Sequence, residues 1–116
     1  MEQQKIRALV GQLSLEEKAG LTSGQDNWFT KAVERLGIPA VRTSDGPNGL
    51  RTQEGDTNGL SEELSREAVC FPTASASAAS SDTALLEEMG HELGKEAQAL
   101  GVDVILGPGV NMKRSP

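Results

Sequence analysis

Hydrophobic residues are spaced in two different ways along the chain, and the spacing separates helical from extended segments. Residues 2–12 place Ile6, Leu9 and Val10 at helical spacing, which predicts a short amphipathic helix. A longer stripe of the same period predicts the strongest helix, over residues 83–100, and its apolar members are Leu85, Leu86, Met89, Leu93, Ala97 and Leu100. The charged residues of that stretch fall on its other faces.

Polar residues and a glycine mark where helices are expected to begin and end. Ser14 and Glu17 have the spacing of a capping box, in which each side chain accepts a hydrogen bond from the other residue's backbone amide. The helix that follows is expected to run to about Thr22. Asp82 is a good N-cap for the strongest helix, and Gly101 is placed to end it.

Short apolar or extended runs lie between the helices. Residues 39–43, 69–72 and 102–106 are of β-strand type. Residues 52–65 are polar, acidic and glycine-containing, which predicts an exposed excursion between core elements. The order strand, loop, strand, helix, strand predicts an α/β fold, and it looks like the opening portion of a parallel (β/α)8 TIM-type barrel that is cut short at Pro116.

The length and the net charge of the chain exclude several classes of fold and of binding partner. The chain has 116 residues, enough for one small domain but not for a complete large barrel. Its net charge of −6 argues against nucleic acid or an anionic membrane surface as partner. No apolar run is long enough to span a bilayer, and the N-terminus lacks a signal-peptide pattern. With a single cysteine that excludes an internal disulfide, the cytoplasm is the expected compartment.

The candidate chemistry lies on one loop, residues 41–51, which passes from an extended run into a turn with two glycines and a proline. Asp45 is expected at the tip of a strand, where α/β folds place binding and catalytic residues. Arg51 can return toward the same space as a planar fork of donors. Acceptor and donor together suit a polyhydroxylated ligand. The alternative, equally compatible with the spacing, is that Asp45 bonds its own backbone in an Asx-turn and Arg51 is a solvated charge.

Other candidate residues carry weaker signals. Trp28 lies on a polar loop and is either a structural lid or a stacking face for a ligand. Cys70 adjoins an apolar run and is expected to be a buried, inert thiol. His91 is expected to be exposed and paired with Glu87, so no metal and no cofactor are predicted. Residues 73–81 contain only Ala, Ser and Thr, which indicates close packing, space at the mouth of a site, or low complexity.

Taken together, several stretches resemble the N-terminal barrel domain of glycoside hydrolase family 3, the β-glucosidase group, over essentially the whole chain. The resemblance is carried by Leu13-Ser14-Leu15-Glu16-Glu17-Lys18, Thr22-Ser23-Gly24-Gln25-Asp26-Asn27-Trp28, Leu36-Gly37-Ile38-Pro39, Ser44-Asp45-Gly46-Pro47-Asn48-Gly49-Leu50-Arg51, Phe71-Pro72-Thr73 and residues 106–116. The resemblance implies retaining hydrolysis of terminal β-D-glucosyl residues by the complete protein. It also implies that Asp45 and Arg51 bind the sugar in the −1 subsite.

The resemblance further implies that this chain contains no catalytic residue. Retaining glycosidases need a nucleophile and an acid/base about 5 to 5.5 Å apart, and in the family both come from later parts of the barrel. Lys113 and Arg114 precede the family's next sugar-binding arginine and are not its equivalent. The chain alone is therefore expected to be inactive. Its expected partners are a β-glucoside or oligosaccharide substrate and the remainder of the barrel with the C-terminal domains. The alternatives are a non-catalytic carbohydrate-binding module and a nonfunctional remnant.

Overall fold

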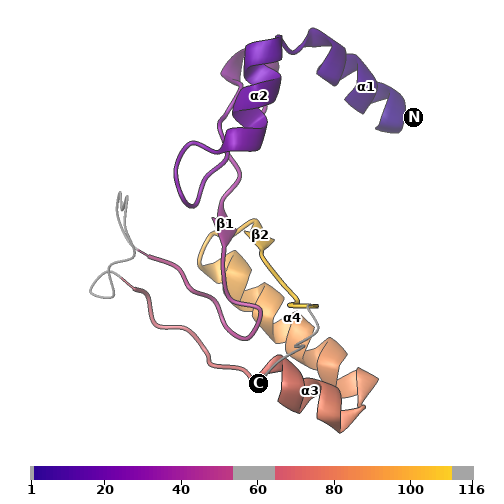
Figure 1. Ribbon diagram of the computed structural model, residues 1–116, viewed down its shortest axis with the longest axis vertical. Helices are drawn as coiled ribbons and strands as arrows, with labels where there is room; N and C mark the ends of the chain where they lie inside the picture. Colours follow the sequence, from indigo (N-terminus) through magenta and orange to yellow (C-terminus); the bar gives the residue numbers. More distant parts are fainter. Residues whose placement is uncertain (1, 54–64, 111–116) are drawn as a thin grey trace, which may run out of the picture. The chain divides into compact units, whose positions relative to one another are not determined.

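The computed structural model describes residues 2–53 and 65–110 of the chain. The chain forms two compact units, Met1–Arg42 and Thr43–Pro116, which are described separately (Figure 1). Most of the expected excursion, residues 54–64, lies outside the described residues. The residues on either side of this gap are joined by a backbone bridge between Gln53 and Ser65, and Thr52 and Gln53 are both buried. No helix within the described ranges is long and apolar enough to cross a membrane.

The first unit begins with the two helices that the sequence predicts. Helix α1 covers Glu2–Gln12, and α2 covers Leu15–Ser23. The capping box at the start of α2 is confirmed: the Glu17 amide donates to Ser14 Oγ over 3.1 Å, and the Ser14 amide donates to the Glu17 carboxylate over 2.8 Å. These two bonds satisfy amides that a helix N-terminus otherwise leaves without partners. A 3-10 turn, η1 (Glu34–Leu36), follows later in the unit.

Arg35 connects three parts of the first unit. Its Nε donates to Glu17 Oε1 over 2.6 Å, and its Nη2 bonds both Glu17 Oε2 and the backbone oxygen of Gln12, the latter over 2.9 Å. The guanidinium therefore ties η1 to the end of α1 and the capping box of α2. The hydrogen bonds from Arg35 and from the Ser14 amide lower the pKa of Glu17 from 4.5 to about 2.

Because of this network, the first unit is expected to lose stability at acidic pH. Because the folded-state pKa of Glu17 is depressed, its contribution is present above about pH 4.5 and is lost as the pH falls toward 2. The protection of the α2 amides against hydrogen exchange, relative to the intrinsic exchange rate at each pH, is expected to fall over this range as the carboxylate is protonated. Glu17→Gln should exchange faster at neutral pH and lose this pH dependence, whereas Glu16→Gln should keep it. Identical profiles for Glu17→Gln and the parent chain would contradict the assignment.

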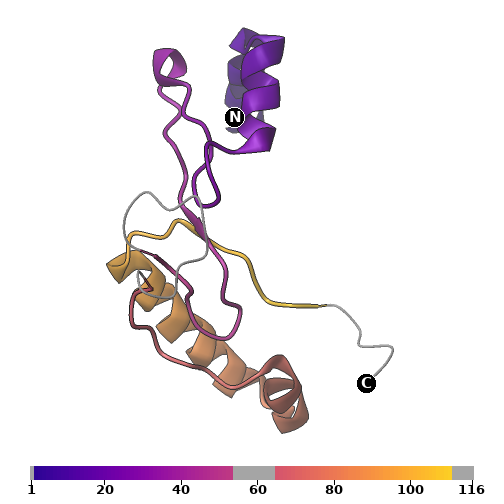
Figure 2. The same cartoon turned by 60° about the vertical axis from the view of Figure 1, so that its left-hand side comes forward.

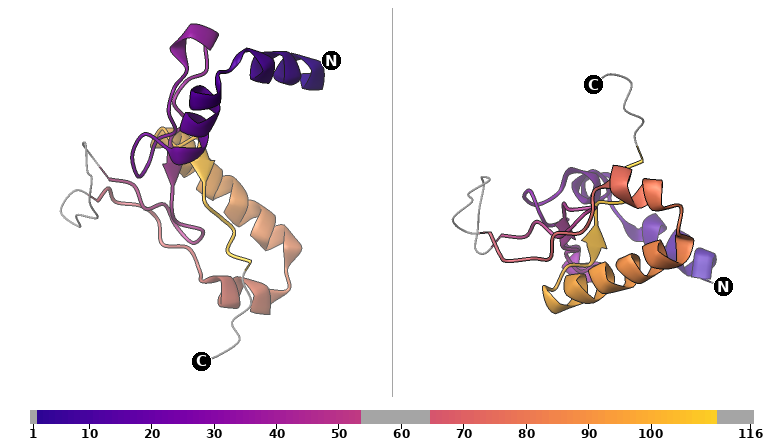
Figure 3. Two further views of the ribbon diagram at one scale, coloured as in Figure 1. Left: turned by 45° about the horizontal axis from the view of Figure 1, so that its top comes forward. Right: turned by 90° about the horizontal axis from the view of Figure 1, so that it is seen from below.

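The second unit is built on a parallel strand pair. Strand β1 (Thr43–Ser44) pairs with β2 (Val104–Ile105), in the register Thr43 with Val104 and Ser44 with Ile105. Helix α4 (Thr83–Ala99) connects them in the chain, and Figure 3 shows it running as one long rod beside the strands. The buried cluster contains Leu50, Ala97 and Val102, with Ala68, Leu93, Leu100 and Ile105 packed against it. The class is thus mixed α/β, and no closed barrel is present among the described residues.

The strongest predicted helix is confirmed at both ends. Asp82 caps α4 by accepting hydrogen bonds from the amides of Ala84 and Leu85, each over 3.1 Å. Gly101 follows the helix with φ of +67°, the left-handed conformation that glycine adopts most readily at a helix end. The apolar stripe is only partly covered: Ala97 is 6% exposed, but Leu85 is 50% exposed. The uncovered apolar side chains lie toward the helix start.

The expected strand over residues 69–72 is wrong. Pro72 has no N–H for a ladder, and the other amides of this segment bond elsewhere: the Val69 amide donates to Glu96 Oε1, and the Phe71 amide donates to the Asn48 carbonyl, both over 2.8 Å. The segment is thereby held to α4 and to a loop rather than to a strand.

Residues 73–81 form a helix rather than a low-complexity connection. Helix α3 covers Ala74–Ser80 and is capped by Thr73, whose Oγ1 accepts from the Ala76 amide. It meets α4 at a tight corner, visible in Figures 2 and 3, where Ser81 takes φ of +53°.

Two expectations of burial also fail. Cys70 is exposed rather than buried, because no strand forms around it and no described element covers it. In the run 102–106 only Val102 is buried, while Val104 is 44% and Leu106 55% exposed. Among the described residues β2 pairs with β1 alone. Its apolar β-branched side chains therefore have fewer neighbours to pack against than those of a central strand in a larger sheet.

Candidate functional site

The backbone brings Asp45 and Arg51 together at the base of one tight loop. The loop begins at the carboxyl end of β1, and the Arg51 amide donates to the Asp45 carbonyl over 3.1 Å, so that the two residues form an antiparallel bridge. Inside the loop the Gly49 amide donates to the Gly46 carbonyl over 3.3 Å. Asp45 and Arg51, the residues singled out from the sequence, therefore lie on neighbouring backbone positions.

Two glycines are required for this loop to close. Gly46 and Gly49 have φ of +114° and +134°, which residues with a side chain rarely adopt. A Cβ on Gly46 would lie 1.8 Å from the Gly49 oxygen, and a Cβ on Gly49 would lie 2.3 Å from the Val69 oxygen. Neighbouring backbone atoms thus occupy the positions where a side chain at Gly46 or Gly49 would stand.

The start of the loop is anchored in the strand pair. Ser44 is completely buried, its hydroxyl donates to the Asp45 carbonyl over 2.8 Å, and its own carbonyl accepts from the Leu106 amide over 2.8 Å. These bonds fix the backbone on which Asp45 is carried.

The Asp45 and Arg51 side chains are available to a ligand. Both residues are exposed. Within residues 2–53 and 65–110, neither side chain makes a hydrogen bond or an ion pair. The Asx-turn proposed as the alternative for Asp45 is absent from this part of the chain. The loop thus carries a carboxylate acceptor and a guanidinium donor on neighbouring backbone positions, and groups of these two kinds can bind the hydroxyls of one ligand.

The weaker candidates do not form a second polar site. His91 is exposed, and its Nε2 lies 4.0 Å from Glu87 Oε1 on the same helix, as expected. No group of three metal-ligating side chains occurs in the described ranges. Trp28 lies in the first unit, half-buried, in a loop where its amide donates to Asp26 Oδ1 over 2.7 Å.

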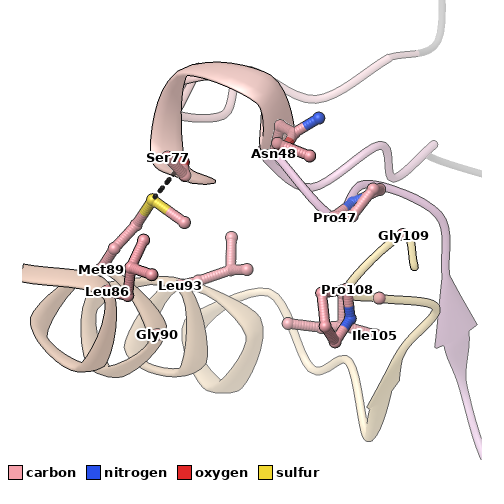
Figure 4. Close-up of a pocket in the computed structure, with 12 residues that line it drawn as sticks. Pro47, Asn48, Ser77, Leu86, Met89, Gly90, Leu93, Ile105, Pro108 and Gly109 are labelled. Carbon is pink, nitrogen blue, oxygen red and sulfur yellow. Dashed lines mark hydrogen bonds between the residues drawn. The ribbon is translucent and has the colours of Figure 1, made fainter. Parts of the chain in front are cut away.

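An apolar cavity beside the loop was not anticipated from the sequence. It has a volume of about 480 Å³ and is bounded by Leu86, Met89 and Leu93 of α4, Ser77 of α3, and Pro47 and Pro108 of two loops (Figure 4). Its lining residues carry no charged side chain, and most of them are apolar, with Asn48 and Ser77 as the polar members. Two sequence signals bear on it: the apolar stripe within residues 83–100, and the small residues 73–81, for which space at the mouth of a site was one of the expectations.

Comparison with known proteins places the chain beside β-glucosidases, although no family model matches it. Thermostable β-glucosidase B of Acetivibrio thermocellus is 51% identical over 111 residues, which are 96% of this chain and 15% of that protein. The chain therefore spans about a seventh of that curated relative's length.

Solved structures give the same result. The β-glucosidase of Kluyveromyces marxianus in complex with glucose matches with a TM-score of 0.81 and 42% identity, over 96% of this chain and 12% of that one. The GH3 β-glucosidase of Bifidobacterium adolescentis matches with a TM-score of 0.73 and 42% identity, over 90% of this chain and 14% of that one.

Proposed function

Since the chain belongs, as a segment, to the β-glucosidases of glycoside hydrolase family 3, we propose that it is part of a retaining β-glucosidase and builds one side of its sugar site. In this proposal residues 1–116 are the opening portion of a (β/α)8 barrel, and residues 52–65 are an excursion from it. The parallel pairing of β1 and β2, joined through α4, supports this assignment. The rest of the barrel and the further domains belong to the same protein, on the same or a separate chain.

Asp45 and Arg51 bind the terminal glucosyl unit in the −1 subsite. The observation that supports this assignment is a backbone bridge between Asp45 and Arg51 at the end of β1, with both residues exposed. The Asp45 carboxylate accepts hydrogen bonds from sugar hydroxyls, and Arg51 donates to the same sugar. Such contacts fix the anomeric carbon in position for attack, which lowers the entropic part of the activation barrier.

This chain supplies binding groups, and the two carboxyl groups of a retaining glycosidase come from elsewhere in the protein. A retaining glycosidase needs a nucleophile and an acid/base about 5 to 5.5 Å apart, and in this proposal Asp45 has neither of these roles. No observation favours a non-catalytic binding module or a remnant, and the relatives reported above are all named β-glucosidases.

The test compares the complete native protein with the 116-residue chain made alone. The complete protein is expected to hydrolyse an aryl β-D-glucoside with retention of configuration, and the 116-residue chain is expected to show no turnover. An aryl α-D-glucoside is the matched control substrate and should be left intact by both. Hydrolysis by the 116-residue chain, or inversion of configuration by the complete protein, would overturn the proposal.

A further inference from the structure

The loop that carries Asp45 and Arg51 is in contact with a glycine from the other end of the second unit. Gly107 follows β2, and the space where its side chain would stand is occupied by Pro47, at the middle of the loop. A Cβ placed on Gly107 would lie 2.9 Å from both Cα and Cβ of Pro47, closer than side-chain carbons approach in proteins. Pro47 and Pro108, the residue after Gly107, both line the apolar cavity (Figure 4).

The need for glycine at this position comes from the contact rather than from the backbone conformation. Gly107 is not among the glycines with positive φ, so its backbone would accept an alanine. The Cα of Pro47 is a backbone atom and cannot turn aside as a flexible side chain would. Any side chain at position 107 must therefore displace the loop itself.

The loop has little room to absorb such a displacement locally. It is closed on itself by the bonds from Arg51 to Asp45 and from Gly49 to Gly46. Asn48 is held by the Phe71 amide over 2.8 Å, and Gly49 packs on the Val69 backbone. A shift of Pro47 is thus transmitted to the residues at the base of the loop.

We propose that Gly107 is a positioning residue for the sugar site: by packing on Pro47 it sets the placement of Asp45 and Arg51 and hence the affinity for glucose. This inference rests on the proposed function, because it assigns the consequence of the contact to sugar binding. Gly107 touches no sugar and acts only through the loop.

The test uses Gly107→Ala in the complete protein, with Gly109→Ala as the matched control, because a Cβ on Gly109 meets nothing within 4 Å. The probe is the inhibition constant of glucose against an aryl β-glucoside. Gly107→Ala is expected to weaken glucose binding about tenfold, since a misplacement of about 1 Å in a site can cost about a hundredfold in rate. Gly109→Ala should change it less than about twofold.

Two further readouts separate positioning from general destabilisation. In hydrogen exchange, Gly107→Ala should accelerate the amides of Arg51 and Phe71, whose acceptors lie on the loop, while the amides of α2 remain unchanged. In a double-mutant cycle, the effect of Gly107→Ala on glucose affinity should shrink to about threefold or less in an Asp45→Ala background, because Gly107 acts through that side chain.

The outcomes distinguish this inference from the proposed function. Equal glucose affinity and equal exchange in Gly107→Ala and Gly109→Ala would overturn the inference and leave the function intact, as would full additivity with Asp45→Ala. Absence of glucose binding and hydrolysis in the parent protein would overturn the function, while the exchange data would still decide whether Gly107 sets the loop. If Gly107→Ala does not fold, Pro47→Gly tests the same contact from the loop side, because it removes the Pro47 Cβ, one of the two atoms that lie closest to the side-chain position of Gly107. Glucose affinity and Arg51 exchange unchanged from the parent in Pro47→Gly would then overturn the inference.

Discussion

Asp45→Ala in the complete protein is expected to lower kcat/KM for an aryl β-glucoside by about two orders of magnitude or more. The Asp45 carboxylate is exposed and makes no hydrogen bond within the described residues, so its bonding capacity is left for the ligand. A hydrogen bond to a charged group contributes about 1.5–3 kcal/mol, and the loss of two corresponds to a rate change of this size. Asp45→Asn, which keeps the shape and removes the charge, should lose less.

Steady-state kinetics and the inhibition constant of glucose measure this effect. Glu87→Ala is the matched control, because Glu87 is an exposed carboxylate on α4 that only approaches His91. Arg51→Ala should resemble Asp45→Ala in direction, and Arg51→Lys should restore only part of the loss, since lysine lacks the planar fork. An Asp45→Ala protein with kcat/KM within a factor of about three of the parent would remove Asp45 from the sugar site.

Gly46→Ala is expected to have the largest effect on the fold of the second unit. Its Cβ would meet the Gly49 oxygen at 1.8 Å, the Gly49 carbonyl carbon at 2.7 Å and the Leu50 Cα at 2.9 Å, all backbone atoms. Its φ of +114° adds conformational strain. We expect a loss of at least about 2 kcal/mol in the free energy of unfolding, together with loss of glucose binding, because the loop cannot close.

Gly94→Ala is a control that is expected to change the free energy of unfolding in the opposite direction, toward greater stability. Gly94 lies within α4, and a Cβ there meets nothing within 4 Å. Alanine favours a helix interior over glycine by about 0.5–1 kcal/mol, so this variant should be stabilised. Denaturant unfolding of the two variants and the parent compares these effects. A Gly46→Ala protein as stable as the parent would mean that the loop does not have the closed conformation described here.

The sequence predicts the elements whose signals are local. The capping box of Ser14 and Glu17, the N-cap Asp82 and the terminal Gly101 each depend on residues within one helical turn, and each is found as expected. The juxtaposition of Asp45 and Arg51 is also local, since six residues containing two glycines and a proline leave few ways to close the loop. Periodicity and capping chemistry are therefore sufficient for these features.

The features that the sequence does not predict depend on partners far along the chain. Val69 and Phe71 have the residue types of a strand, but their amides bond Glu96 and Asn48, and no sequence pattern specifies those acceptors. The same holds for Cys70, whose exposure follows from the missing strand. The contact of Gly107 with Pro47 depends on how β1 and β2 register, which becomes visible only once the two strands are placed side by side.

The parallel pairing of β1 with β2 also sets an order of folding. Parallel neighbours need a crossover between them, and here the connection contains α3 and α4. Closing so long a connection costs chain entropy that two short strands cannot offset by themselves. We therefore expect helix α4 to form and pack against its apolar partners before the two strands pair. During synthesis, β1 leaves the ribosome well before β2 exists, so the strand pairing that anchors the loop of Asp45 and Arg51 can form only after β2 has been made.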